Sequence, residues 1–192
     1  MTARLVACAV LCAGLAGCAV AHDHDELTGL FNQGLKEYDA GHYEAAFKIF
    51  QSIDEEDVAA MRNEGLMLRR GQGVEKDPKA AEEILERAAE AGLATAQYDL
   101  AEMLLNGEAG DPDPKEALPW LTSAAAAHHP IAEYRLGLMY EEGTVVEKNL
   151  GFARTLYTQA AAGGVADAKE RLAKLPLVPA APVPLPSATP NP

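Results

Sequence analysis

The sequence predicts an all-α fold, a right-handed α-solenoid of helix–turn–helix repeats with about nine helices. The first observation behind this prediction is a step of 36 residues that relates several sets of small residues. Two of these sets are Ala60, Ala96, Ala132, Ala168 and Gly71, Gly107, Gly143. The second observation is that apolar residues recur within each step at i, i+3 and i+4, the spacing of an amphipathic helix. A period kept without insertion over most of a chain is typical of repeat proteins.

The first 17 residues predict a secretory signal peptide. Arg4 is their only charged residue, and an apolar run from Leu5 to Ala16 follows it. That run is too short to span a bilayer as a helix. The segment Leu15–Cys18, LAGC, resembles a bacterial lipobox, which implies cleavage before Cys18 and lipidation of its thiol. The alternative is ordinary cleavage after Ala21, which would release a soluble protein.

Residues 18–26 are expected to form a linker before a first helix at Leu27. Its HDHDE stretch could hold a divalent ion weakly or be a solvated linker, and we expect no metal site. Cys8, Cys12 and Cys18 are the only cysteines, so none lies in the folded part. Thiol catalysis, disulfide scaffolding and cysteine-zinc sites are therefore excluded there.

Residues 27–57 are expected to form a degenerate helix pair that caps the N-terminal end, followed by repeats at 58–93, 94–129 and 130–164. Each repeat contains two helices joined by a glycine-containing turn, and Asp77-Pro78 and Asp113-Pro114 supply an N-cap and a first helical residue. The stretch GQGVEKDPKA could be taken for a phosphate-binding loop. It recurs in altered form in each repeat, which favours a turn between helices.

The sequences AxAQYxLAxxLxxG and AEYRLGLMYEEGTVVEKNLGFARTLYTQAAAGG resemble the Sel-1-like repeat family, a variant of the tetratricopeptide repeat. The resemblance covers about residues 58–164 and implies an α-solenoid. It also implies a binding scaffold or regulator of other proteins. Some secreted, cysteine-rich members have been linked to penicillin binding or β-lactam hydrolysis, which gives an enzyme as the alternative. This chain lacks their regular cysteine pairs.

The C-terminal end is expected to be a capping helix at 165–175 and then a disordered, proline-rich tail at 176–192. Two positions depart from the repeat. Glu64 occupies the slot of Leu100, Leu136 and Leu172; it is either partly exposed against a small cap or a buried acid. His128 occupies a glycine slot beside His129, and adjacent helical residues point apart, so we expect no metal there.

The charge and the residue types limit the function. The net charge of −13 argues against nucleic-acid binding. No nucleophile–base–acid set is visible, so we expect no catalytic residues and no cofactor.

Helical geometry predicts a partner-binding groove on the first helices of the repeats. Its candidate residues are Arg62, Arg69, Tyr98, Glu102, Tyr134 and Glu141. The two tyrosines would form a short aromatic ladder, or each would pack against the adjoining helix. We expect a monomer that binds an extended peptide or a partner protein, and we expect that partner to be a membrane-attached or other envelope protein. The protein would contact the membrane only through the lipid. It would be located in the periplasm or be an outer-membrane lipoprotein.

Overall fold

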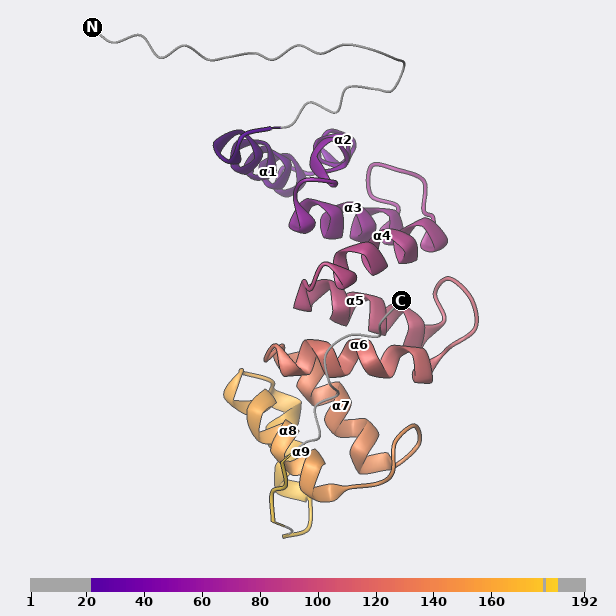
Figure 1. Ribbon diagram of the computed structural model, residues 1–192, viewed down its shortest axis with the longest axis vertical. Helices are drawn as coiled ribbons and strands as arrows, with labels where there is room; N and C mark the ends of the chain where they lie inside the picture. Colours follow the sequence, from indigo (N-terminus) through magenta and orange to yellow (C-terminus); the bar gives the residue numbers. More distant parts are fainter. Residues whose placement is uncertain (1–21, 178, 183–192) are drawn as a thin grey trace, which may run out of the picture.

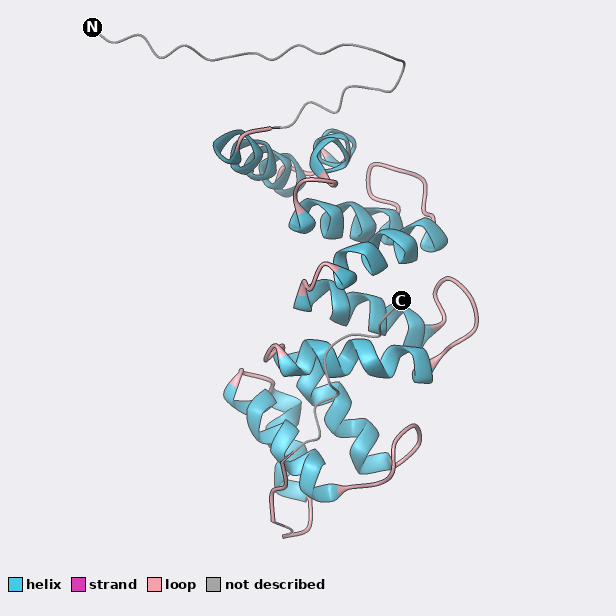
Figure 2. Ribbon diagram, in the orientation of Figure 1, coloured by secondary structure: helices cyan, strands magenta, loops and turns pink. Residues whose placement is uncertain are grey.

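The computed structural model describes residues 22–177 and 179–182. The predicted signal peptide, the lipobox with Cys18, and tail residues 183–192 lie outside this part of the chain. The described residues form helices and loops without any strand (Figure 2). The helices are α1 (His24–Asp39), α2 (Tyr43–Ile53), α3 (Val58–Arg70), α4 (Pro78–Glu90), α5 (Ala94–Asn106), α6 (Pro114–Ala126), α7 (Pro130–Glu142), α8 (Leu150–Ala162) and α9 (Ala166–Lys174). They follow one another along the long axis in chain order, as expected for an all-α solenoid (Figure 1).

The first helix begins at His24, three residues before the expected start at Leu27, so the expected linker is partly helical. The reason is local: the side chain of Asp23 accepts a hydrogen bond from the Glu26 N–H at 2.8 Å and caps the helix. His22 is also held, because its N–H and its Nδ1 lie 3.0 and 2.8 Å from the Glu56 carboxylate. The hydrogen bond to Glu56 raises the pKa of His22. The HDHDE stretch therefore contains the N-cap and the first residues of α1.

The turns inside the repeats are closed by capping at both ends. Asp77 and Asp113 accept N–H hydrogen bonds from the first turns of α4 and α6. Gly107 ends α5 in the left-handed region, at φ 64°, and a Cβ there would lie 2.6 Å from the Pro112 ring. The Asp113 N–H then returns to the Leu104 carbonyl at 2.8 Å. These bonds make the segment a helix-to-helix turn.

Small residues allow the helices to approach one another closely. Ala60, Ala96, Ala132 and Ala168, related by the 36-residue step, are all fully buried. A Cβ at Gly65 would lie 2.9 Å from Leu85, and one at Gly137 would lie 2.6 Å from Tyr157. The larger side chain of each pair, on the second helix of the repeat, fills the space that the glycine leaves on the first.

Glu64 is buried, and the expectation of partial exposure is wrong: only 4% of its surface remains accessible. Gln51 of α2 donates a hydrogen bond to its Oε1 at 3.2 Å, while Oε2 has no partner among the described residues. Burial, and then the negative charge of Asp54, raise the pKa of Glu64. The cap therefore covers the slot that leucine fills in the other repeats.

The beginning of the proline-rich tail is docked, which corrects the expectation of a disordered tail for the described residues 179–182. The Ala181 N–H donates to the Gly151 carbonyl of α8 at 3.2 Å. Thr155 of the same helix donates to the Ala181 carbonyl at 2.6 Å. The chain thus turns back after α9 and runs along α8.

Replacing Glu64 with leucine is expected to stabilise the protein at pH 7 by about 1–2 kcal/mol, because it removes a buried, incompletely bonded carboxylate. The pKa of Glu64 is higher in the folded than in the unfolded chain, so the carboxylate destabilises the fold above the folded pKa. This cost disappears below the unfolded pKa, where both states are protonated.

The gain from Glu64→Leu should therefore shrink as the pH falls. Thermal unfolding at pH 7 and pH 4 measures it, with an expected rise of roughly 2–8 °C at pH 7. Glu64→Gln is the matched control, since it removes the charge but keeps an acceptor for Gln51. A lower melting temperature for Glu64→Leu at pH 7 would contradict the argument.

Candidate interaction surface

The four charged residues among the six predicted groove residues each pair with a side chain of a neighbouring repeat or cap. Arg62 and Arg69 lie on α3, Tyr98 and Glu102 on α5, and Tyr134 and Glu141 on α7. The two tyrosines instead have ring contacts inside their own repeats, Tyr98 with His129 and Tyr134 with Tyr157 of α8. The first helices of consecutive repeats thus lie side by side and share one surface, which we call the first-helix surface.

A series of ion pairs crosses this surface from one repeat to the next. Arg62 Nε lies 2.6 Å from Asp99 Oδ2, linking α3 to α5. Arg135 Nη2 lies 2.8 Å from Glu102 Oε2, linking α7 to α5. All such pairs on the surface are Arg62–Asp99, Arg69–Glu108, Glu102–Arg135 and Glu141–Arg171. The four charged residues that the sequence predicted are therefore all paired within the chain.

The predicted charges thus link neighbouring repeats to one another. Hydrogen bonding to Arg69 lowers the pKa of Glu108. Glu102 is 9% exposed, and its Oε1 has no partner among the described residues. Leu66 and Leu138 occupy the same slot in the flanking repeats. The carboxylate is thus paired with Arg135 in a position that otherwise holds an apolar side chain.

The two tyrosines do not contact each other as a ladder. The Tyr98 ring stacks on His129, the N-cap of α7, at a centroid distance of 4.7 Å. The Tyr134 ring lies 5.7 Å from Tyr157 of α8. Burial lowers the pKa of His129, which favours the neutral ring whose Nδ1 accepts from the Ala132 N–H. Packing against the adjoining helix, the second of the two expectations, describes Tyr134, whose ring meets α8, whereas the Tyr98 ring meets the residue that caps α7. Both tyrosines remain partly exposed.

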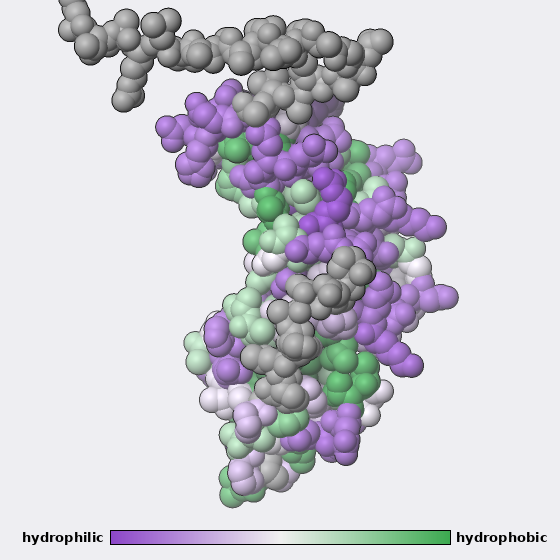
Figure 3. All heavy atoms as spheres, in the orientation of Figure 1, coloured by the Kyte–Doolittle hydropathy of each residue, from purple (hydrophilic) through white to green (hydrophobic). Residues whose placement is uncertain are grey.

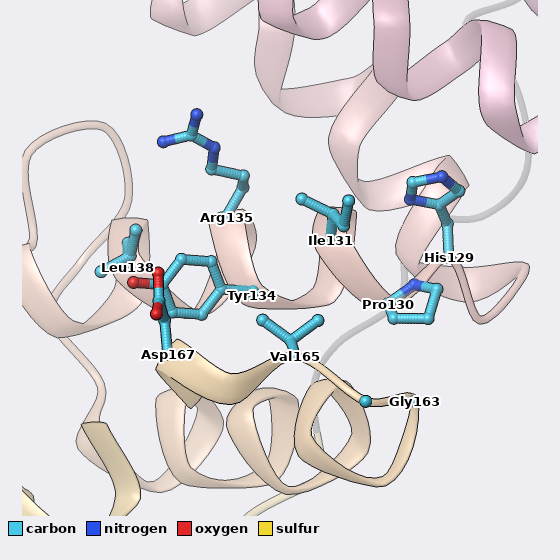
Figure 4. A pocket seen from close by; sticks show the side chains of 10 residues that line it. His129, Pro130, Ile131, Tyr134, Arg135, Leu138, Gly163, Val165 and Asp167 are labelled. Carbon is cyan, nitrogen blue, oxygen red and sulfur yellow. The ribbon is translucent and has the colours of Figure 1, made fainter. Parts of the chain in front are cut away.

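A pocket of about 700 Å³ opens between α7 and the start of α9. Figure 4 shows Ile131 and Tyr134 of α7 and Val165 around one space, with Asp167 beside Tyr134. The Arg135 side chain extends away from Asp167, in keeping with its bond to Glu102 of α5. Ile131 is 44% exposed, which is unusual for a large apolar side chain in this protein. Sequence reasoning missed this pocket because it depends on how α9 sits against α7.

Two charged side chains, Arg135 and Asp167, line the pocket together with apolar residues, while much of the rest of the molecule is polar. Hydrophilic residues cover α1 and the edge that carries the loops after α3 and α5 (Figure 3). A second hollow along α9, lined by Tyr134, Asp167, Glu170, Arg171 and Lys174, adjoins the pocket through its two shared residues. The first-helix surface thus combines paired charges with one apolar depression at its C-terminal end.

The described residues contain no group of three or more His, Asp or Glu side chains placed to hold a metal ion. His128 adopts φ 58°, the left-handed conformation of the glycine that other repeats carry there, and its Nδ1 lies 3.3 Å from Glu133. His129 instead caps α7. The two histidines therefore serve separate contacts. Within this part of the chain, no helix is both long and apolar enough to cross a membrane.

Truncating Arg135 to alanine is expected to lower the free energy of unfolding by about 1–2 kcal/mol. The reason is that Glu102 would remain buried without its counter-charge, although Arg135 itself is partly exposed. The double variant Arg135→Ala/Glu102→Leu should recover most of the loss, since leucine fills this slot in the flanking repeats. Urea unfolding measures both. Lys48→Ala, which breaks the exposed Lys48–Glu44 pair, is the control; equal losses in the two single variants would contradict the argument.

Comparison with known proteins agrees with this architecture. A Sel1 repeat protein from Oxalobacter formigenes is 34% identical, with a TM-score of 0.70 over 74% of this chain and 58% of that one. A protective antigen of uropathogenic Escherichia coli is 24% identical, with a TM-score of 0.72 over 78% of this chain and 33% of that one. Helicobacter pylori cysteine rich protein B is 20% identical, with a TM-score of 0.54 over 66% of this chain and 96% of that one.

The chain thus spans 58% and 33% of the length of the first two structures. The last two likenesses show the fold alone. No curated protein matches the sequence. The model of the Sel1 repeat matches residues 58–93, 94–129 and 130–165, more than half of the chain. The protein belongs to the Sel1 repeat family.

Proposed function

We propose that the protein is a non-enzymatic scaffold of the bacterial cell envelope that binds an extended peptide or a partner protein on the first-helix surface. Proteins built from Sel1 repeats generally act as scaffolds for protein interactions. The groove and the envelope location are our extension of that role to this chain.

The observation that carries the proposal is the pocket between α7 and α9. Ile131, Tyr134 and Leu138 offer it apolar surface from one helix, and Val165 offers more from the start of the next. Burying the exposed 44% of Ile131 against a partner would contribute roughly 1 kcal/mol, and tyrosines are frequent anchors of interfaces. The pocket is therefore suited to an apolar side chain of the partner.

The ion pairs next to the pocket favour a pre-organised surface. Arg135 is held by Glu102, and Arg171 at the adjoining hollow is held by Glu141. Side chains already fixed before binding lose less conformational entropy when a partner arrives. These arginines are already paired within the chain. Charged groups of a partner would therefore contribute more to the orientation of the bound partner than to the affinity of binding.

The alternative of a β-lactam-binding or β-lactam-hydrolysing enzyme gains no support from these observations. That alternative rested on a resemblance to cysteine-rich members of the family. At 20% identity, the likeness to cysteine rich protein B shows a shared fold and nothing about activity. No catalytic set was recognised in the sequence.

Replacing Ile131 with aspartate is expected to reduce partner binding at least tenfold while changing the melting temperature by less than roughly 4 °C. Ile131 lies in the first turn of α7, where a carboxylate is favoured by the helix dipole, and Asp167 holds the equivalent slot of α9. Helix formation should therefore be preserved.

Affinity capture from envelope extracts with quantitative mass spectrometry measures this loss. Leu35→Asp is the matched control, because Leu35 is an exposed apolar residue on α1, far from the pocket in the sequence. The proposal requires a captured protein whose recovery depends on Ile131 and not on Leu35. Equal recovery with all three chains would count against the pocket.

Export and a lipid on Cys18 form the second part of the proposal. Only five residues, 19–23, separate Cys18 from the start of α1, so they span at most about 18 Å. His22, the fourth of them, is bonded to Glu56 near the α2–α3 turn. A lipid on Cys18 would then hold the α1–α2 end of the solenoid close to the bilayer, with the pocket between α7 and α9 at the opposite end of the long axis (Figure 1).

Cys18→Ser is expected to abolish palmitate labelling and to move the protein from the membrane to the soluble fraction, because the lipid is attached to this thiol. Labelling and fractionation of cells measure the change. Cys12→Ser, in the same segment but outside the lipobox, should leave both unchanged. Unaltered fractionation of Cys18→Ser, with His22 as the mature N-terminus, would favour ordinary cleavage after Ala21.

A further inference from the structure

One side of α8 carries an extended segment of the chain's own tail. Ala181 is held by both of its backbone groups: its N–H donates to the Gly151 carbonyl at 3.2 Å, and its carbonyl accepts from Thr155 Oγ1 at 2.6 Å. Closer to α9, Arg154 Nη2 donates to the Pro176 carbonyl at 2.7 Å. We call Gly151, Arg154 and Thr155 the α8 tail site.

All three residues of the α8 tail site depart from the repeat. The slot of Gly151 holds Lys79 and Lys115 in the preceding repeats. A Cβ at Gly151 would lie 3.0 Å from the Pro179 carbonyl oxygen and 3.1 Å from the Ala181 Cβ, so a longer side chain would collide with the tail. The other two slots hold Glu82 and Leu118 in place of Arg154, and Glu83 and Pro119 in place of Thr155. The contact face is therefore specific to α8.

A hollow of about 240 Å³ adjoins the site. Its lining comes from the end of α6, from His128, and from Leu156 and Gln159 of α8, and Pro182 of the tail also borders it. The docked segment is Pro179-Ala180-Ala181-Pro182, in which two prolines flank two small residues. Such a segment favours the extended polyproline conformation before binding and so loses little entropy on docking.

We propose that the α8 tail site recognises an extended Pro-x-x-Pro peptide, and that residues 179–182 occupy it within the same chain. The N–H of the residue before the second proline is essential, because it meets the Gly151 carbonyl. This surface lies on a second helix of a repeat, and its ligand is different from the partner proposed for the first-helix surface. The inference therefore goes beyond the proposed function and does not rest on it.

Occupancy within the chain follows from the short connection. Leu175 is buried at the end of α9, and only residues 176–178 join it to Pro179. A tether this short gives the tail an effective concentration on the order of millimolar at the site. A proline-rich peptide from another protein must compete with it and binds only weakly while the tail is docked.

The test uses the full-length chain carrying Ala181→Pro, which removes the N–H that donates to Gly151. The probe is a fluorescein-labelled peptide with the sequence of residues 175–184, LPLVPAAPVP. Fluorescence anisotropy should show at least tenfold tighter binding to Ala181→Pro than to the unaltered chain, because the site has been vacated. The same peptide with proline at the position of Ala181 should not bind either chain.

Two further variants in the Ala181→Pro background keep the test independent of folding. Gly151→Lys restores the residue of the preceding repeats, so α8 should form normally by circular dichroism while probe binding is abolished. Thr155→Val removes one hydrogen bond and should weaken binding about fivefold. No gain of binding by Ala181→Pro, or a gain that survives Gly151→Lys, would overturn the proposal. If the unaltered chain forms a dimer and Gly151→Lys dissociates it, the tail on α8 belongs to a second copy. That result would overturn the proposal that residues 179–182 occupy the site within the same chain.

Discussion

The close approach of helices at alanine and glycine is the constraint on which the other features of this structure depend. Fully buried alanines recur at one slot in every repeat, and Gly65 and Gly137 lie against Leu85 and Tyr157 with no room for a Cβ. With few aromatic residues to fill wider gaps, larger side chains at these slots would push the helices apart. The two helices of a repeat would then shift relative to each other, and with them the first helices whose arginines and carboxylates now meet at 2.6–3.3 Å.

The ion pairs change what the first-helix surface can offer to a partner. A row of free arginines and acids would attract partners by charge, whereas a row of internal pairs is largely neutralised. What remains available is partly exposed aromatic and aliphatic surface, concentrated where Ile131, Tyr134 and Val165 border the pocket. Shape and apolar contact, more than charge, are therefore the properties by which such a surface would select a partner.

Departures from the repeat occur at both ends of the solenoid. At the N-terminal end, α2 covers Glu64 in a slot that leucine fills elsewhere, so a carboxylate is buried where the other repeats bury an apolar side chain. At the C-terminal end, Gly151 and Thr155 form hydrogen bonds with the returning tail. An end repeat has a neighbour on one side only, and its remaining face must be covered by something other than a copy of itself.

The sequence by itself determined the helices, their order, the turns and most of the caps. These features depend on residues a few positions apart, such as Asp77 and Pro78, and the 36-residue step repeats the same local signals. Which predicted surface residues would be paired, which rings would meet, and where a pocket would open were decided only by the tertiary structure. Arg62 and Asp99 lie 37 residues apart, and Ala181 and Gly151 lie 30 apart. Whether such residues meet depends on the distance and rotation between packed helices. Many buried side chains set these two quantities together, so no local sequence pattern predicts them.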